Sequence, residues 1–256
     1  MPQWSWIGAC STGSSHIRAG TTCQDSASCI ELALRDQHAL LAIVSDGAGS
    51  AQYSAIGSRL VVECFARCVI AHLRASQPLE TITKELVLDW LDNVRDHIFR
   101  SAEQRAISPR DMAATLVGAI VFSNRAIVCH VGDGACVLRK KGESEWRVPS
   151  WPAHGEYASS TYFVTDDPEP NLQFQLLEGE FNEVAIFSDG IERLALDFVN
   201  GNAFAPFFEP MFAPLVALRP GRDRRLSLGL RKYLDSPRVI ERTDDDKSLI
   251  LARRVI

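Results

Sequence analysis

The stretch Ala39-Leu40-Leu41-Ala42-Ile43-Val44-Ser45-Asp46-Gly47-Ala48-Gly49-Ser50 shows how this chain is built. Its first six residues form a continuous apolar run, with the length of a buried strand. The next six are rich in Gly, Ser and Asp, which favour turns. The stretch therefore predicts a buried strand over 39–44 that ends in a turn carrying Asp46.

Two long helices are expected after this turn. Apolar residues recur at helical spacing from Ile56 to His72, and again from Leu79 to Ile98. The period then changes to that of strands. Strands are predicted over residues 115–122, 126–131, 135–139, 172–176, 184–187 and 248–252. The region 198–233 has a helical pattern that four prolines interrupt.

This order of elements favours an α+β fold with antiparallel sheets over a doubly wound parallel sheet, because the strands come as hairpins after an inserted helix pair. No Pro/Gly/Ser-rich linker and no internal repeat divides the sequence. We therefore expect a single domain over residues 1–256.

Composition excludes several classes of protein. Of 256 residues, 46% are hydrophobic, which is enough for a sizeable core and argues against disorder. A net charge of −5 argues against a nucleic-acid binder. No stretch approaches the roughly 18 apolar residues of a membrane span, and no secretory signal is recognisable. Seven cysteines without a C-x-x-C pair predict a reduced, cytoplasmic protein.

Three predicted strands end in a turn with an aspartate followed by glycine: Asp46, Asp133 and Asp189. Acidic residues also flank strands at Asp25 and at 244–246. If these strand ends face one another, the carboxylates converge and repel unless a cation lies among them. Carboxylate oxygens suit Mg²⁺ or Mn²⁺, and two such ions would bind phosphate oxygens and activate a water. Asp-Gly is also a common turn dipeptide, so the spacing alone leaves a metal site and ordinary turn chemistry both open.

The order of the motifs resembles a known family. The matching segments are Ser15-His16, Cys23-Gln24-Asp25, 45–49, 114–116, 131–133, 187–190 and 245–248. Together they are similar to the metal-dependent PP2C-type serine/threonine protein phosphatases, and most of all to their compact bacterial branch. The resemblance spans nearly the whole chain. It implies a sandwich of two antiparallel β-sheets flanked by helix pairs, and hydrolysis of phosphoserine or phosphothreonine without a phosphoenzyme.

The resemblance also implies roles for individual residues. Asp46 would bridge two Mn²⁺ or Mg²⁺ ions, with the Gly47 carbonyl on one of them. Asp189 and Asp245 would hold the other ion, and Asp133 would help to bind a third. Asp25 would orient the attacking water. The implied partners are a phosphoprotein substrate and a Ser/Thr kinase or its targets, and the implied state is a monomer.

Several positions depart from the family pattern. Gln24 stands where many members have a metal-binding glutamate, so the second ion would bind more weakly. Ser50-Ala51 replaces the usual Gly-His, which removes the usual general acid, and Gly134-Ala135 also differs. Arg18 is the candidate for pairing with substrate phosphate, since a guanidinium matches phosphate oxygens. For His16 a structural role is favoured over that of a catalytic acid.

Two other classes of function stay open. A strand, the loop 45–49 and a helix could hold a nucleotide phosphate, but Gln52 occupies the third glycine position of G-x-G-x-x-G. A phosphatase fold without catalysis could serve as a regulatory partner, although the three retained aspartates at 46, 189 and 245 argue against it. A basic cluster is interpreted as a solvated helix face rather than as a docking patch; it comprises Arg222, Arg224, Arg225 and Arg231. Four aromatic residues between 146 and 162 are expected to pack against the sandwich rather than to form a mobile flap.

Overall fold

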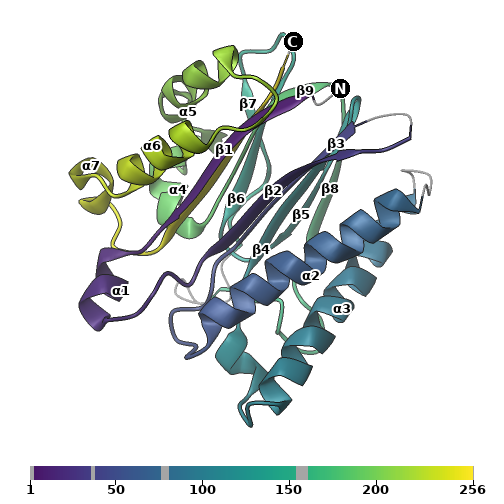
Figure 1. Cartoon of the computed structure of the whole chain (residues 1–256), viewed down its shortest axis with the longest axis vertical. Coiled ribbons are helices and arrows are strands. Elements are labelled where there is room, and N and C mark those ends of the chain that lie inside the picture. Colours follow the sequence, from purple (N-terminus) through teal and green to yellow (C-terminus); the bar gives the residue numbers. More distant parts are fainter. Residues whose placement is uncertain (1–2, 36–37, 76–80, 154–160, 256) are drawn as a thin grey trace.

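The computed structural model describes residues 3–35, 38–75, 81–153 and 161–255. Two β-sheets lie face to face, and helices cover both outer faces (Figure 1). The six-stranded sheet contains, in spatial order, β12 (Gly221–Arg222), β1 (Trp4–Ser11), β13 (Lys247–Arg254), β9 (Phe181–Phe187), β6 (Ala135–Lys140) and β7 (Trp146–Ser150). The five-stranded sheet contains β2 (Ser26–Ala33), β3 (His38–Ser45), β4 (Leu116–Val121), β5 (Arg125–Val131) and β8 (Gln173–Glu178). The predicted α+β sandwich is confirmed.

The strand β3 shows why two layers of core form. Its side chains alternate, so that Leu41 and Ile43 face the helices while Leu40 and Val44 face the other sheet. Both faces are buried, which explains the continuous apolar run. Every pairing between strands of the two large sheets is antiparallel except the short one of β1 with β12.

The helices α2 (Ser54–Arg74) and α3 (Lys84–Glu103) cover the five-stranded sheet. Their facing residues include Phe65 and Trp90, whose rings meet edge to face at 5.9 Å. The second helix begins later than its apolar period suggested, because the Thr83 side chain caps it by accepting the Leu86 N–H at 3.3 Å. Residues 76–80 lie outside the described residues.

The other sheet is covered by shorter helices from the proline-rich region. They are α4 (Asp189–Ala195), α5 (Ala205–Phe212), η3 (Ala213–Ala217), α6 (Arg224–Leu234) and α7 (Pro237–Ile240). Trp146 packs under α5, 5.1 Å from Phe208 and 4.9 Å from Phe212. Packing of this aromatic residue is therefore confirmed, although it is buried rather than exposed. Tyr157, also named as a candidate for a flap, lies outside the described residues.

Two elements near the start of the chain, β1 and the short helix α1 (Ser14–Ala19), had no prediction from the sequence, and β2 had none beyond a strand beside Asp25 without stated bounds. The strand β2 lies at a sheet edge and most of its residues are only half-buried, so it lacks an apolar run. In β1, Ser5 and Gly8 interrupt the apolar pattern.

None of the helices in the described part of the chain combines the length and the apolar character that a membrane span requires.

Candidate metal centre

Three aspartates from separate loops meet at one end of the sandwich. Asp46 follows β3, Asp133 follows β5, and Asp189 follows β9 at the start of α4. One carboxylate oxygen from each lies within 4.8 Å of the others. The two sheets present these strand ends on the same side. This is the convergent arrangement that the strand-Asp-Gly spacing left open beside ordinary turn chemistry.

The three aspartates open into a cavity of about 370 Å³. Gly47 and Asp245 also line it, and so do Thr115 and Thr161. The loop 46–50 forms one wall. A nucleotide phosphate alone would be repelled by so many carboxylates, so this loop does not act as the phosphate cradle of the nucleotide-binding alternative.

Glycines allow these loops to approach closely. A Cβ at Gly47 would lie 2.8 Å from the carbonyl oxygen of Gln24, and one at Gly190 would lie 2.0 Å from that of Asp246. The first contact brings the loop of Gln24 and Asp25 against Asp46. The second brings the segment of Asp245 against Asp189. Glycine after aspartate is therefore required by neighbouring backbone as well as by turn geometry.

The electrostatics of the cluster favour a cation. Burial raises the pKa of Asp189 to about 8, and the Asp133 and Asp245 carboxylates add to the rise. Burial, together with the Asp25 and Asp189 carboxylates, also raises the pKa of Asp46 well above its usual range. A divalent cation would relieve this repulsion, and clustered carboxylate oxygens are the donors that Mg²⁺ and Mn²⁺ prefer. The residues present therefore fit such an ion.

Asp25 lies buried behind Asp46 and is not among the residues that line the cavity. Burial raises its pKa to about 6, against the effect of hydrogen bonds. The Ser188 hydroxyl donates to Asp25 Oδ2 at 2.8 Å and accepts the Ser248 N–H at 2.9 Å. This serine connects β9 and β13 to the aspartate, so two neighbouring strands of the six-stranded sheet fix the position of Asp25, which directly precedes β2 of the other sheet.

Asp246 joins three segments at the back of the site. Its carboxylate is buried and accepts the Gly13 N–H at 2.6 Å and the Gln24 N–H at 2.5 Å. His16 Nδ1 lies 3.2 Å from the same carboxylate, and His16 Nε2 lies 3.7 Å from Asp245. The contacts agree with a structural role for His16. They also show that Asp246 holds the loops of Gln24 and Asp245 in place.

Besides Asp25, two more predicted site residues lie apart from the cavity lining, Gln24 and Arg18. Gln24 approaches the site through its backbone, while its buried Oε1 has no hydrogen-bond partner among the described residues. Arg18 lies on α1 and pairs with Asp244 at 3.3 Å, with both side chains 68% exposed. Their roles toward a metal and toward phosphate stay predictions.

Four residues near the site were not singled out from the sequence: Thr115, Thr161, Ser188 and Asp246. Thr115 Oγ1 accepts the Asp46 N–H at 3.0 Å, and the Thr161 hydroxyl donates to Asp133. Thr115, Ser188 and Asp246 all stand inside the matching motifs, so a signal for them was present. Thr161 stands in a loop segment without a motif.

Replacing Ser188 with Ala is expected to lower kcat by about 10- to 100-fold, the usual cost of losing a residue that orients a metal-site group. It should also lower the free energy of unfolding by about 1–3 kcal/mol, because the Ser248 N–H loses its partner. Steady-state kinetics and urea unfolding measure the two effects. The exposed Ser123→Ala is the control. Wild-type kcat in the Ser188 variant would contradict the proposed link to Asp25.

The fold and the acidic centre define a class of protein, and comparison with known sequences identifies it. Residues 12–234 match the protein phosphatase 2C family. The chain belongs to this family and is a protein phosphatase of the metal-dependent class.

Individual relatives agree with this assignment. Serine/threonine-protein phosphatase 3 of Escherichia coli (strain K12) is 34% identical over 251 residues, which cover 97% of this chain and 98% of that protein. Among solved structures, a bacterial serine phosphatase superposes with a TM-score of 0.67 at 12% identity, covering 100% of this chain and 98% of that one. The catalytic domain of the phosphatase PstP, in complex with two manganese ions, superposes with a TM-score of 0.59 at 16% identity, and both chains are covered in full. At such identities these structures establish the fold.

Proposed function

We propose that this chain removes phosphate from phosphoserine and phosphothreonine side chains of proteins, using Mn²⁺ or Mg²⁺ held in the acidic cavity. The observation that carries the proposal is the convergence of Asp46, Asp133 and Asp189 within 4.8 Å. The E. coli relative named a serine/threonine-protein phosphatase supports the substrate class. The manganese ions of PstP support the choice of cation.

The carboxylates have separate roles in this proposal. Asp46 and the Gly47 carbonyl would hold one ion, and Asp189 and Asp245 would hold a second, with the Asp46 carboxylate shared between the two. Asp133 would contribute to a third ion. When bound, such ions bind the phosphate oxygens and make a water nucleophilic near neutral pH.

The remaining residues position these ligands. Asp25 orients the water through Asp46, since it lies behind that carboxylate rather than in the cavity. The Gln24 amide offers a neutral oxygen, which would leave one ion more weakly held than a glutamate would. Arg18 would reach substrate phosphate after leaving the exposed Asp244. The residues of this chain would therefore hold the cations, orient the water and contact the phosphate, while the cations would supply the positive charge.

A cysteine nucleophile has no support in the structure. Burial raises the pKa of Cys10 to about 11 and that of Cys129 to about 12, so both thiols stay protonated at neutral pH. All seven cysteines are free.

Free thiols support our further proposal of a reducing, cytoplasmic location. We also propose that the protein acts as a monomer, on proteins that a Ser/Thr kinase has phosphorylated.

The purified protein is expected to hydrolyse a phosphothreonine peptide and p-nitrophenyl phosphate when Mn²⁺ or Mg²⁺ is present. EDTA should abolish turnover, because the carboxylates cannot replace the charge that binds phosphate, and excess Mn²⁺ should restore it. Release of inorganic phosphate measures the reaction. Activity that persists in EDTA would contradict the metal mechanism. If the protein hydrolyses neither substrate in the presence of Mn²⁺ or Mg²⁺, the proposed function is wrong.

A further inference from the structure

Two hollows away from the acidic cavity join across β1. One, of about 210 Å³, lies between β1 and β2, and the other, of about 460 Å³, lies between β1 and α6. They share Gly8, Ala9, Cys10 and Arg222, so they form one continuous depression. We call it the basic groove, and define it by Arg222, Arg224, Ser227, Leu228, Arg231 and four residues of β1, namely Trp6, Gly8, Ala9 and Cys10.

The charge of the basic groove is entirely positive. Arg222, Arg224 and Arg231 line it, and no Asp or Glu of the described ranges does. Among the described residues, none of these arginines has a carboxylate within 4.0 Å. Arg222 is held over the strand by a 3.4 Å hydrogen bond to the Gly8 carbonyl. The net charge of the chain is −5, so three guanidinium groups without a carboxylate partner make the charge of this groove opposite to that of the protein as a whole.

The helix α6 presents one stripe to the groove. Residues 224, 227, 228 and 231 follow the i, i+3, i+4, i+7 spacing that places side chains on one helix face. Leu230 and Leu234 pack on the sheet instead. Leu228 is 63% exposed in the groove between two arginines. The stripe therefore combines two cations with an apolar contact, a pattern suited to a protein segment rather than to a small inorganic anion.

The groove is lined by residues of β1 and β2, which run side by side between the two helix layers (Figure 1). The strand β1 runs from the groove to the catalytic end. Cys10 pairs with Ser248, the neighbour of Ser188, and Gly13 donates to Asp246. A segment bound along β1 would therefore end beside the acidic cavity.

We propose that the basic groove binds an acidic, extended segment of the phosphoprotein substrate, separate from the residue that is dephosphorylated. This inference rests on the proposed function. The β1 residues from Trp6 to Cys10 match about five extended residues, at about 3.3 Å each. Asp, Glu or a second phosphorylated residue would pair with the arginines, and an apolar side chain would cover Leu228. The groove then selects which phosphoproteins reach the site.

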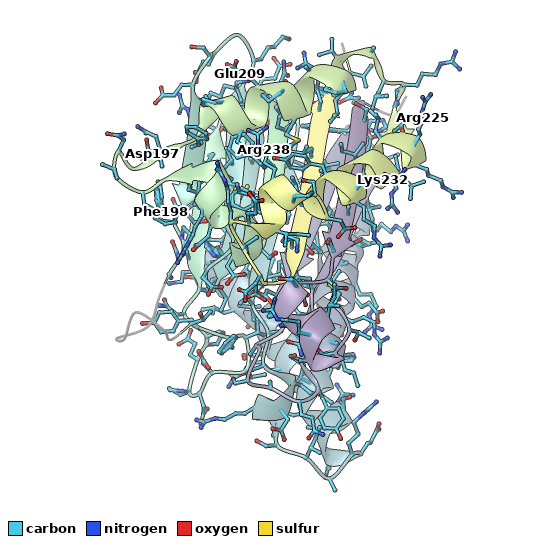
Figure 2. The ribbon with its side chains drawn as sticks, turned by 90° about the vertical axis from the view of Figure 1, so that its left-hand side faces the viewer. Asp197, Phe198, Glu209, Arg225, Lys232 and Arg238 are labelled. Atoms are coloured by element: carbon cyan, nitrogen blue, oxygen red, sulfur yellow. The ribbon has the colours of Figure 1, made fainter. Side chains whose placement is uncertain are left out.

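Two matched pairs of substitutions on α6 test the proposal. The groove pair is Arg224→Glu with Arg231→Glu. The control pair, Arg225→Glu with Lys232→Glu, makes the same change in net charge one residue further along, about 100° around the helix. Neither Arg225 nor Lys232 lines the groove, and both lie on the exposed side of α6 (Figure 2).

The measurement compares two phosphothreonine peptides. In one, a Gly/Ser linker joins the phosphothreonine segment to an acidic tail that contains one leucine. In the other, the same linker joins it to a neutral tail of equal length. The wild type is expected to have a kcat/KM ratio that favours the acidic tail. The groove pair should lower this ratio by about fivefold or more, and the control pair should leave it unchanged. Added salt should lower it as well. A wild-type ratio near one, or an equal drop in both pairs, would overturn the proposal.

Binding measured without turnover separates this proposal from the proposed function. Fluorescence anisotropy of a labelled, unphosphorylated acidic peptide reports the groove directly. The groove pair should bind this peptide at least about fivefold more weakly than the control pair does. A protein that binds the peptide in this way but hydrolyses nothing would refute the phosphatase mechanism and leave the groove intact. Equal binding by both pairs would refute the groove.

Discussion

The Asp46→Asn variant is expected to lose more than about 100-fold in phosphatase activity while keeping its fold. Residues that only orient metal ligands cost 10- to 100-fold when replaced, and Asp46 stands closer to the chemistry than those. Its carboxylate lies among those of Asp25, Asp133 and Asp189. An amide there removes the negative charge that two cations would share. The loss should appear in kcat and in the Mn²⁺ concentration needed for half-maximal rate.

The fold of this variant should survive, and its metal-free form should be at least as stable as the wild type. Removing one charge from a buried cluster of carboxylates relieves repulsion when no cation is bound. Circular dichroism, urea unfolding in EDTA and Mn²⁺ titration calorimetry measure these effects. Asp96→Asn, on the exposed face of α3, is the matched control. Full activity in the Asp46 variant would show that the cavity is not the catalytic site.

The Asp246→Asn variant is expected to lose about 2–4 kcal/mol of unfolding free energy. Both oxygens of the buried carboxylate accept backbone N–H groups, from Gly13 and Gln24. Hydrogen bonds to a charged group contribute about 1.5–3 kcal/mol each. The NH₂ group of an asparagine side chain would face one of the two backbone N–H groups, and two donors cannot form a hydrogen bond with each other. The same change should lower activity at least about tenfold, because the loops of Asp25 and Asp245 lose their common anchor.

Asp244→Asn provides the control for this prediction. It lies two residues earlier in the same loop, but its side chain is exposed and forms an ion pair with the exposed Arg18. Exposed ion pairs contribute about 0–1 kcal/mol, so little change is expected. Urea unfolding in EDTA keeps bound metal from masking the difference, and an unchanged slope against urea shows that the midpoint reports stability. Equal effects at the two positions would show that Asp246 is not a special anchor.

The parts of the molecule that the sequence predicted are those whose signal is local. The strand at 39–44 and the helix that follows have side chains buried on defined faces, so their periodicity is visible. The turn aspartates could be placed near one another because each ends a predicted strand. The prediction of convergence then needed only the antiparallel hairpins and the family resemblance.

What escaped prediction depends on contacts far apart in sequence. The strand β2 is half-buried at an edge, so its side chains carry a weak pattern. Ser188 looked like part of a turn, since its partners Asp25 and Ser248 lie 163 and 60 residues away. Asp246 was hidden in a run of three aspartates of which only the buried one anchors the loops. The arginines of α6 could not be divided into groove and solvent faces before the helix was placed against β1.

The strand β13 has a consequence for the biosynthesis of the enzyme. It comes last of the strands in chain order, yet it lies between β1 and β9 in the middle of its sheet. Asp245 precedes this strand directly, and Ser248 within it supports Asp25 through Ser188. Pairing over such separations is slow, because loop closure must precede the contacts that reward it. A nascent chain on the ribosome therefore acquires its catalytic centre only after β13 has emerged and paired with β1 and β9.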